Sequence, residues 1–260
     1  MDIKDNNACA DCAIHNTEGL KKLGVDTSNI DFVVALAGNP NTGKSTVFNA
    51  LTGLRQHTGN WPGKTVLRAE GGYSFNKSRY KLIDLPGTYS LLSTSQDEEV
   101  ARNFILFGRP NVTVIVVDAS RLERNLNLVL QVLEITNKAV LCLNLLDEAE
   151  RHHIKIDQRS LGRDLGIPVV GTIARSKVGI PELLQTIDDV ATGKIVCNPH
   201  KVKNLTESIE KSVKQLTEKI AEQFPGLPNS RWVAFRLLEG DSRITEAVKN
   251  NELSELILDE

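Results

Sequence analysis

The sequence has 260 residues, 40% of them hydrophobic, and a formal net charge of −2 at pH 7. This length suits one domain with a smaller unit beside it, and the balanced charge excludes a general attraction to nucleic acid. No apolar run approaches the roughly 20 residues of a membrane-spanning helix, and the polar start lacks the features of a signal peptide. Together with four cysteines that suggest no disulfide framework, this predicts a soluble, cytosolic chain.

Residues 1–31 are expected to form a loosely attached polar leader, because their one short helical pattern ends at a glycine. After this leader, short apolar runs alternate with amphipathic stretches. The apolar runs that fit strands buried on both faces are 32–37, 80–85, 112–118, 139–146 and 167–174. The stretches with helical spacing are 44–53, 97–107, 124–137, 157–166 and 179–193.

This alternation predicts an α/β domain over residues 32–196 with a mostly parallel, six-stranded sheet. The stretch 65–85 fits two strands joined by a polar turn, which places one antiparallel strand at the sheet edge. Strand patterns then stop, and apolar residues recur at spacings of three and four. Residues 197–260 are therefore expected to form a small all-α helical domain, with Trp232 in its core.

The stretch GNPNTGKS, residues 38–45, matches the phosphate-binding loop pattern G-x-x-x-x-G-K-[ST] between an expected strand and helix. Its glycines let backbone N–H groups converge on phosphates, Lys44 supplies positive charge, and the Ser45 hydroxyl can ligate magnesium. The alternative is a chance glycine turn. The residues assigned to the phosphate site are Gly38, Asn41, Thr42, Gly43, Lys44, Ser45 and Thr46.

The stretch DLPG closes the strand 80–85. There Asp84 could hold magnesium through water, and Gly87 could offer its N–H to the γ phosphate. By itself DLPG is also an ordinary strand end, so only its position after the phosphate loop favours a functional role.

The stretch NLLD distinguishes between nucleotides. Asp147 can accept hydrogen bonds from the N1–H and the exocyclic amine of guanine, whereas adenine lacks both donors. Asn144 would brace the loop and meet the guanine edge. After the next strand, TIAR contributes Thr172, Ile173 and Ala174, with the Ala174 N–H directed at guanine O6. All three motifs follow strands at their carboxyl ends, as ligand sites of open α/β sheets do.

These motifs resemble those of Ras-type GTPases of the translation-factor-related class. GNPNTGKSTVFNALTG, GNWPGKTV, IDLPGTYSL, ERNLNLVLQVLE and SRWVAFRLLEGD are similar to the cytosolic portion of the ferrous iron transport protein B (FeoB) family. The resemblance implies a Ras-like P-loop GTPase domain followed by a helical domain often described as suppressing GDP release. It also implies a C-terminal membrane domain, outside this chain, that passes Fe(II) at the cytoplasmic face of the bacterial inner membrane.

The resemblance implies further roles. Thr65 matches a switch threonine that joins the magnesium shell while the γ phosphate is present, and Asn41 matches an asparagine that helps coordinate potassium. Thr88 follows DLPG where many Ras-like enzymes have a glutamine, so we expect slow intrinsic, potassium-stimulated hydrolysis. A tight-turn asparagine and an ordinary loop threonine are the alternatives. The set expected to act in catalysis is Asn41, Lys44, Thr65 and Gly87.

Several alternatives remain open at this stage. A free-standing GTPase acting on RNA or ribosomes is disfavoured, since residues 200–260 hold nine Lys and Arg against eleven Asp and Glu. We expect no nucleic-acid partner. A nucleotide switch with negligible turnover and a homo-oligomer are both compatible with the sequence. Cys9, Cys12 and His15 are metal-ligand types at short spacing, or simply part of a polar tail. Trp61 is either a partner contact or a hinge anchor.

Overall fold

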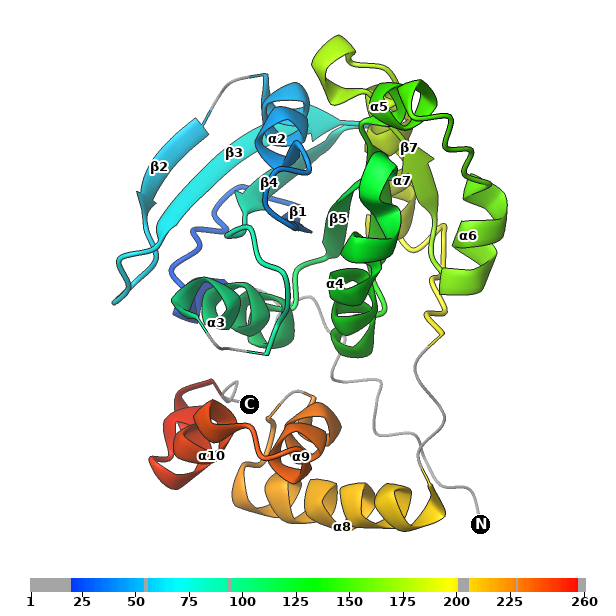
Figure 1. Cartoon of the computed structure of the whole chain (residues 1–260). Coiled ribbons are helices and arrows are strands. Elements are labelled where there is room, and N and C mark those ends of the chain that lie inside the picture. Colours follow the sequence, from blue (N-terminus) through cyan, green and yellow to red (C-terminus); the bar gives the residue numbers. More distant parts are fainter. Residues whose placement is uncertain (1–19, 54–55, 93–94, 201–205, 228, 257–260) are drawn as a thin grey trace.

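A computed structural model of the protein describes residues 20–53, 56–92, 95–200, 206–227 and 229–256. An α/β domain occupies one end of the molecule, and helices near the C-terminus pack beneath it (Figure 1). Cys9, Cys12 and His15 lie outside the described residues.

The sheet has seven strands in the described residues, ordered β2-β3-β4-β1-β5-β6-β7. β4, β1, β5, β6 and β7 run parallel, and β3 is antiparallel to both of its neighbours. The mostly parallel sheet is confirmed, but the strand number and the edge were wrong: β2 adds a seventh strand outside β3. The strands are β1 Phe32–Gly38, β2 Gln56–Asn60, β3 Leu67–Phe75, β4 Ser78–Asp84, β5 Val112–Asp118, β6 Ala139–Asn144 and β7 Val169–Gly171.

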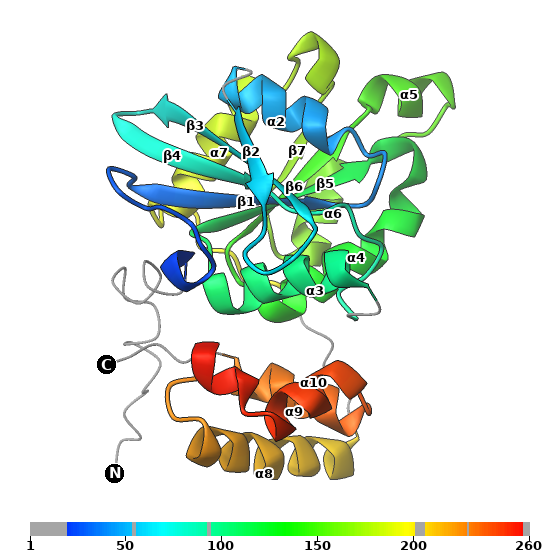
Figure 2. The same cartoon turned by 90° about the vertical axis from the view of Figure 1, so that its left-hand side faces the viewer.

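Helices cover both faces of the sheet, which explains why its central strands are apolar on both faces. α2 (Lys44–Thr52) and α7 (Ile180–Ala191) pack on one face. α3 (Gln96–Asn103), the π-helical turn η1 (Phe104–Gly108) and α4 (Leu122–Ile135) pack on the other. Figure 2 shows α2 and α3 on opposite sides of the sheet.

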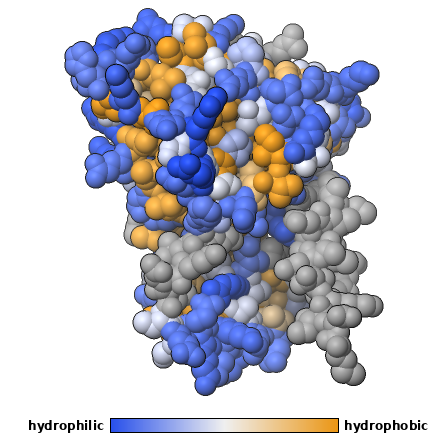
Figure 3. Space-filling view, turned by 90° about the vertical axis from the view of Figure 1, so that its right-hand side faces the viewer, coloured by the Kyte–Doolittle hydropathy of each residue, from blue (hydrophilic) through white to orange (hydrophobic). Residues whose placement is uncertain are grey.

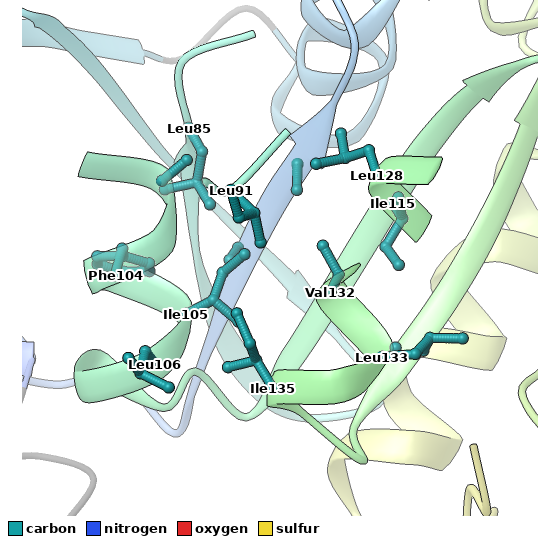
Figure 4. Packing of buried hydrophobic residues seen from close by; sticks show 14 of the residues in the cluster. Leu85, Leu91, Phe104, Ile105, Leu106, Ile115, Leu128, Val132, Leu133 and Ile135 are labelled. Carbon is teal, nitrogen blue, oxygen red and sulfur yellow. The ribbon is translucent and has the colours of Figure 1, made fainter. Parts of the chain in front are cut away.

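The core between η1, α4 and the sheet is formed by aliphatic side chains with Phe104 among them (Figure 4). α4 contributes Leu128, Val132 and Ile135, whose spacing of four and three residues puts them on one helix face. This packing fixes the sheet edge where the strands end. The remaining elements of this domain are α5 Leu146–Arg151, α6 Gln158–Leu165, and the 3-10 turns η2 Ala119–Arg121 and η3 Ala174–Ser176.

Residues 20–31 are not loosely attached, which corrects the expected leader for the part that the structure describes. Leu20 and Val25 are 2% and 1% exposed and belong to the same core as η1 and α4. Lys81 donates to the Asp26 carbonyl at 2.8 Å. Only Leu20 and Val25 of the described residues 20–31 are buried, which is too few to give a sequence pattern.

The helical domain consists of α8 (Glu207–Gln223), α9 (Ser230–Leu238), α10 (Ser242–Lys249) and the turn η4 (Glu252–Leu256). Val233 and Ala234 are its buried centre on α9, whereas Trp232 is only partly buried. Trp232 instead lies beneath Arg102 of α3, 5.8 Å from the guanidinium carbon to the ring centroid. The expected core role of Trp232 was therefore wrong, because this side chain faces the α/β domain.

Two polar contacts also join the domains. Asn229 donates to the Leu106 carbonyl at 3.2 Å, and Arg243 of α10 pairs with Glu99 of α3 at 3.2 Å. Seen from the side of α6, hydrophobic side chains form patches separated by hydrophilic ones (Figure 3). None of the helices in the described ranges is long and apolar enough to cross a membrane.

Candidate nucleotide site

The phosphate loop connects the end of β1 to the start of α2. Gly43 is the N-cap of α2 with φ 79°, a left-handed conformation that glycine adopts without strain. A Cβ atom placed on Gly38 would lie 2.5 Å from the Val116 carbonyl oxygen, and one on Gly43 would lie 2.4 Å from Asn144 Nδ2. Both glycines are thus required by close packing. The first N–H groups of an α-helix have no partner within the helix, so the start of α2 offers donors to an anion.

Lys44 points from the first turn of α2 to the end of β4. Its ammonium group pairs with Asp84 and donates to the Leu85 carbonyl at 2.6 Å. Burial raises the pKa of Asp84, and the charge of Lys44 opposes that rise. The structure therefore brings together the predicted phosphate lysine, on the helix that follows β1, and the predicted magnesium carboxylate, at the end of the adjacent strand β4.

Asn144 holds the loops of the site together. Its Nδ2 donates to the Thr42 carbonyl at 3.0 Å, and its Oδ1 accepts from Thr172 Oγ1 at 3.0 Å and from Ala174 N at 3.1 Å. The bracing role is as predicted. Contact of Asn144 with the base edge stays a prediction: the residue is fully buried, and its oxygen already accepts the Ala174 N–H that was expected to meet guanine O6.

Asp147 lies one turn beyond Asn144, at the start of α5. Arg151 donates to its Oδ2 at 3.2 Å, whereas its Oδ1 is buried without a hydrogen-bond partner. A buried carboxylate oxygen that lacks a partner is costly, so it fits a ligand that brings N–H donors. Leu145, with φ 61°, turns the chain so that Asp147 follows directly after the strand end.

In the described residues the side chain of Thr65 hydrogen-bonds Gln96 of α3, and no hydrogen bond joins it to Ser45 or Asp84. Trp61–Lys64 form a β-turn in which Lys64 N donates to the Trp61 carbonyl at 3.0 Å, and Gly63 takes φ 66° as a type II turn requires. This turn joins β2 to β3. Thr65 stands on the tip of this hairpin, where its hydroxyl contacts Gln96 of α3 at 3.4 Å.

The other predicted residues lie near the phosphate loop. Asn41 is exposed with φ 65°, Ser45 and Thr46 are exposed at the start of α2, and Gly87 is close to Pro40. Thr88 is buried, and its N–H donates to the Gly38 carbonyl at 3.3 Å. The Ile173 N–H already has a partner within the protein, since it donates to the Val178 carbonyl at 3.1 Å.

One residue of the loop, Asn39, was missed from sequence, and the two alternatives left open for Trp61 are resolved. Asn39 is 3% exposed, and neither atom of its amide has a partner. Trp61 is 4% exposed, with its ring edge on Phe104 at 5.3 Å, so it is an anchor of the hairpin and not an exposed contact. Phe104 lies in a helical pattern far along the chain, and no local signal connects the two rings.

Phosphate loop, bracing asparagine and base-side carboxylate, all at the carboxyl edge of a parallel sheet, define a P-loop protein of the Ras-like G-domain class. The sequence profile described as Ferrous iron transport protein B matches residues 32–187. A second, the FeoB cytosolic helical domain, matches residues 206–260. The chain belongs to the ferrous iron transport protein B family.

Individual FeoB proteins and solved FeoB domains are also similar to this chain. The Fe(2+) transporter FeoB of Salmonella typhimurium is 42% identical over 212 residues, covering 80% of this chain and 27% of the relative. The solved cytosolic domain of L. pneumophila FeoB has a TM-score of 0.75 at 34% identity, covering 86% and 88% of the two chains. The T. maritima FeoB cytosolic domain in its GMPPNP form has a TM-score of 0.73 at 36% identity, covering 88% and 87%.

Proposed function

We propose that this chain binds GTP and GDP, hydrolyses GTP slowly, and serves as the regulatory module of a bacterial Fe(II) transporter. The observation that carries the guanine assignment is Asp147 Oδ1, buried without a partner on a loop that Asn144 joins to the phosphate loop. Guanine presents two adjacent N–H donors to such a carboxylate, and adenine presents none. Similar FeoB domains of T. maritima and S. thermophilus have been solved in GDP-bound forms, which supports this choice.

The donor set around the phosphate loop fits magnesium. Ser45 offers an exposed hydroxyl and Asp84 a carboxylate, and such hard oxygen ligands are those that Mg²⁺ prefers. In the proposed triphosphate state Thr65 joins them, which requires the hairpin tip to leave Gln96. When bound, the ion neutralises charge on the β and γ phosphates. Asn41, exposed on the loop, is the proposed ligand for potassium.

Each side chain has a separate task in this proposal. Lys44 exchanges its contacts with Asp84 and Leu85 for phosphate oxygens, and the N–H of Gly87 donates to the γ phosphate. Because Thr88 replaces a water-positioning glutamine, backbone groups of the hairpin tip place the attacking water. Slow turnover follows from this arrangement.

The transport context is a proposal from the relatives. The chain spans 27% of the length of the Salmonella transporter that it matches. We infer that the partner of this module is the membrane domain of a complete transporter, and that the module lies at the cytoplasmic face of the bacterial inner membrane. No nucleic-acid partner is expected, and homo-oligomers are compatible with the proposal.

The test is GTP hydrolysis by the purified chain in matched potassium and sodium buffers, with ATP as the control substrate. We expect faster phosphate release in potassium, a loss of about tenfold in Asn41→Ala, and no turnover of ATP. Asn29→Ala is the matched control, because Asn29 also has a positive φ, 59°, but precedes the domain. Equal rates in both salts would overturn the potassium role of Asn41, and turnover of ATP would overturn the guanine assignment.

A further inference from the structure

The segment 20–26 has a defined conformation ahead of the G domain. Its helical turn ends at Gly24, where Val25 N donates to the Leu20 carbonyl at 2.9 Å and Gly24 N to the Lys21 carbonyl at 2.8 Å. With φ 76° at Gly24, this is the pattern of a Schellman cap. The family profile begins only at residue 32, so this segment precedes the shared domain.

The segment packs between two elements that the proposed switch involves. A Cβ atom on Gly108 of η1 would lie 2.9 Å from Leu23 Cδ1, and one on Gly24 would lie 2.7 Å from Pro62 Cγ. Leu20 and Val25 share a buried cluster with Trp61. The segment therefore touches both η1 and the turn at the tip of the β2–β3 hairpin.

Arg68 fastens this segment to the hairpin. Its guanidinium donates to the carbonyls of Leu23 at 3.3 Å and Gly24 at 2.9 Å, while lying 5.2 Å from the centroid of the Trp61 ring. Glu70 pairs with the Arg68 guanidinium at 2.5 Å, and the Arg68 side chain is only 15% exposed. A planar, charged fork is suited to such simultaneous contacts, and a lysine would not reproduce them.

The same hairpin tip carries Thr65, between Trp61 and Arg68 in sequence. While Arg68 holds the tip, Thr65 remains beside Gln96 and away from Ser45. An interaction made in one of two states shifts the equilibrium by its differential strength. Contacts that favour this arrangement must therefore oppose the binding of a triphosphate that recruits Thr65.

We propose that Arg68 is a positioning residue which, with the segment 20–26, clamps the hairpin in the arrangement that disfavours triphosphate. This rests on the proposed guanine-nucleotide function. The clamp sets the ratio of the affinities for GDP and GTP without touching either nucleotide. It makes the N-terminal segment a built-in regulator of the switch.

The experiment measures the affinities of the full chain for GDP and for the non-hydrolysable analogue GMPPNP by calorimetry. For Arg68→Gln we expect about tenfold tighter GMPPNP binding and unchanged GDP binding, since the competent state becomes more populated. Leu20→Ala, which loosens the segment from η1, should shift the ratio in the same direction. Arg79→Gln is the matched control, because its side chain pairs with Asp31 at 3.7 Å and its backbone pairs with Ser74, at the end of β3 that is remote from the hairpin tip.

The outcomes separate the two claims. A wild-type chain that binds neither nucleotide would overturn the proposed function and the clamp with it. A chain that binds both, with the same affinity ratio in wild type and both variants, would overturn the clamp alone. If the variants fail to fold, hydrogen exchange of the wild type decides: amides 20–26 should exchange faster with GMPPNP than with GDP, and identical exchange contradicts the clamp.

Discussion

Asn144 is the residue on which three loops of the site depend. One buried amide satisfies the Thr42 carbonyl, the Thr172 hydroxyl and the Ala174 N–H, so no water needs to enter between them. Asp147 differs, because its unpartnered oxygen costs stability that a ligand can restore. Asn144 thus braces the loops of the site, while Asp147, three positions further on, is the residue suited to recognise a ligand.

Asn144→Ala should reduce the free energy of unfolding by about 3 kcal/mol, because several buried polar groups lose their partner. This corresponds to a decrease of about 6–12 °C in Tm for a chain of this size. Thermal unfolding by circular dichroism measures it. Asn137→Ala, at an exposed loop position, is the control, and equal Tm values for the two variants would contradict the bracing role.

Asp188 fastens α7 to the β3–β4 turn at the opposite end of the sheet. Burial works against its charged form, but hydrogen bonds from Tyr80, Asn76 and Lys194 outweigh it, so the pKa of Asp188 is lowered. A lowered pKa stabilises the fold above the unfolded value of 3.8, and that stability is lost as the pH falls through the folded value.

Asp188→Asn should therefore reduce the free energy of unfolding at pH 7 by about 1–2 kcal/mol, and the Tm should fall with it. The difference from wild type should shrink as the pH falls below 3.8, where the wild-type carboxylate becomes protonated. Melting curves between pH 3 and pH 7 test this, with Asp189→Asn as the neighbouring control. A difference that stays constant over this range would show that the charge of Asp188 contributes nothing.

The β2–β3 hairpin is the element that differs most from the sequence-based expectation. Residues 56–60, QHTGN, contain no apolar side chain, so no alternating pattern indicates a strand. The strand forms because its backbone pairs with residues 67–71 of β3. Anchoring by Trp61 on Phe104 then depends on tertiary contact that sequence spacing cannot reveal.

α3 connects this hairpin to the helical domain through Glu99. One carboxylate oxygen pairs with Lys64 of the hairpin tip at 3.1 Å, and the other with Arg243 of α10 at 3.2 Å. Burial is the largest single effect on the pKa of Glu99 and raises it, but the combined effect of Lys64 and Arg243 is greater, so the pKa is lowered. The hairpin and the helical domain therefore share one partner on α3.

Glu99→Gln should destabilise the chain by about 1–2 kcal/mol and increase hydrogen exchange in both the hairpin tip and α10, because Lys64 and Arg243 each lose an ion-pair partner. Asp97→Asn, at an exposed position of the same helix, is the control. Faster exchange in only one of the two regions would contradict the shared link.

At the scale of the whole molecule, the fold of the G domain and the residues of its candidate site were predicted mainly from local sequence motifs. The strand–loop–helix pattern around Gly43 and the alternation of apolar runs predict the fold of the G domain, because both patterns can be recognised over short stretches of sequence. Burial of Leu20 against η1 and the orientation of Trp232 toward Arg102 could not be predicted, because each depends on packing between distant segments. The residues of the candidate site could therefore be named from sequence motifs, whereas its links to the segment 20–26 and to the helical domain could not.

The central claim is that Asp147 selects guanine, and the most direct measurement is the affinity for GDP, ADP and XDP of wild type and Asp147→Asn. Wild type should bind GDP about 10³-fold more tightly than ADP. Xanthine has a carbonyl where guanine has its amine, so an asparagine amide complements it, and the variant should prefer XDP over GDP. Asp164→Asn, at an exposed position, should behave as wild type. Equal affinity of wild type for GDP and ADP, or an unchanged preference in Asp147→Asn, would contradict the account.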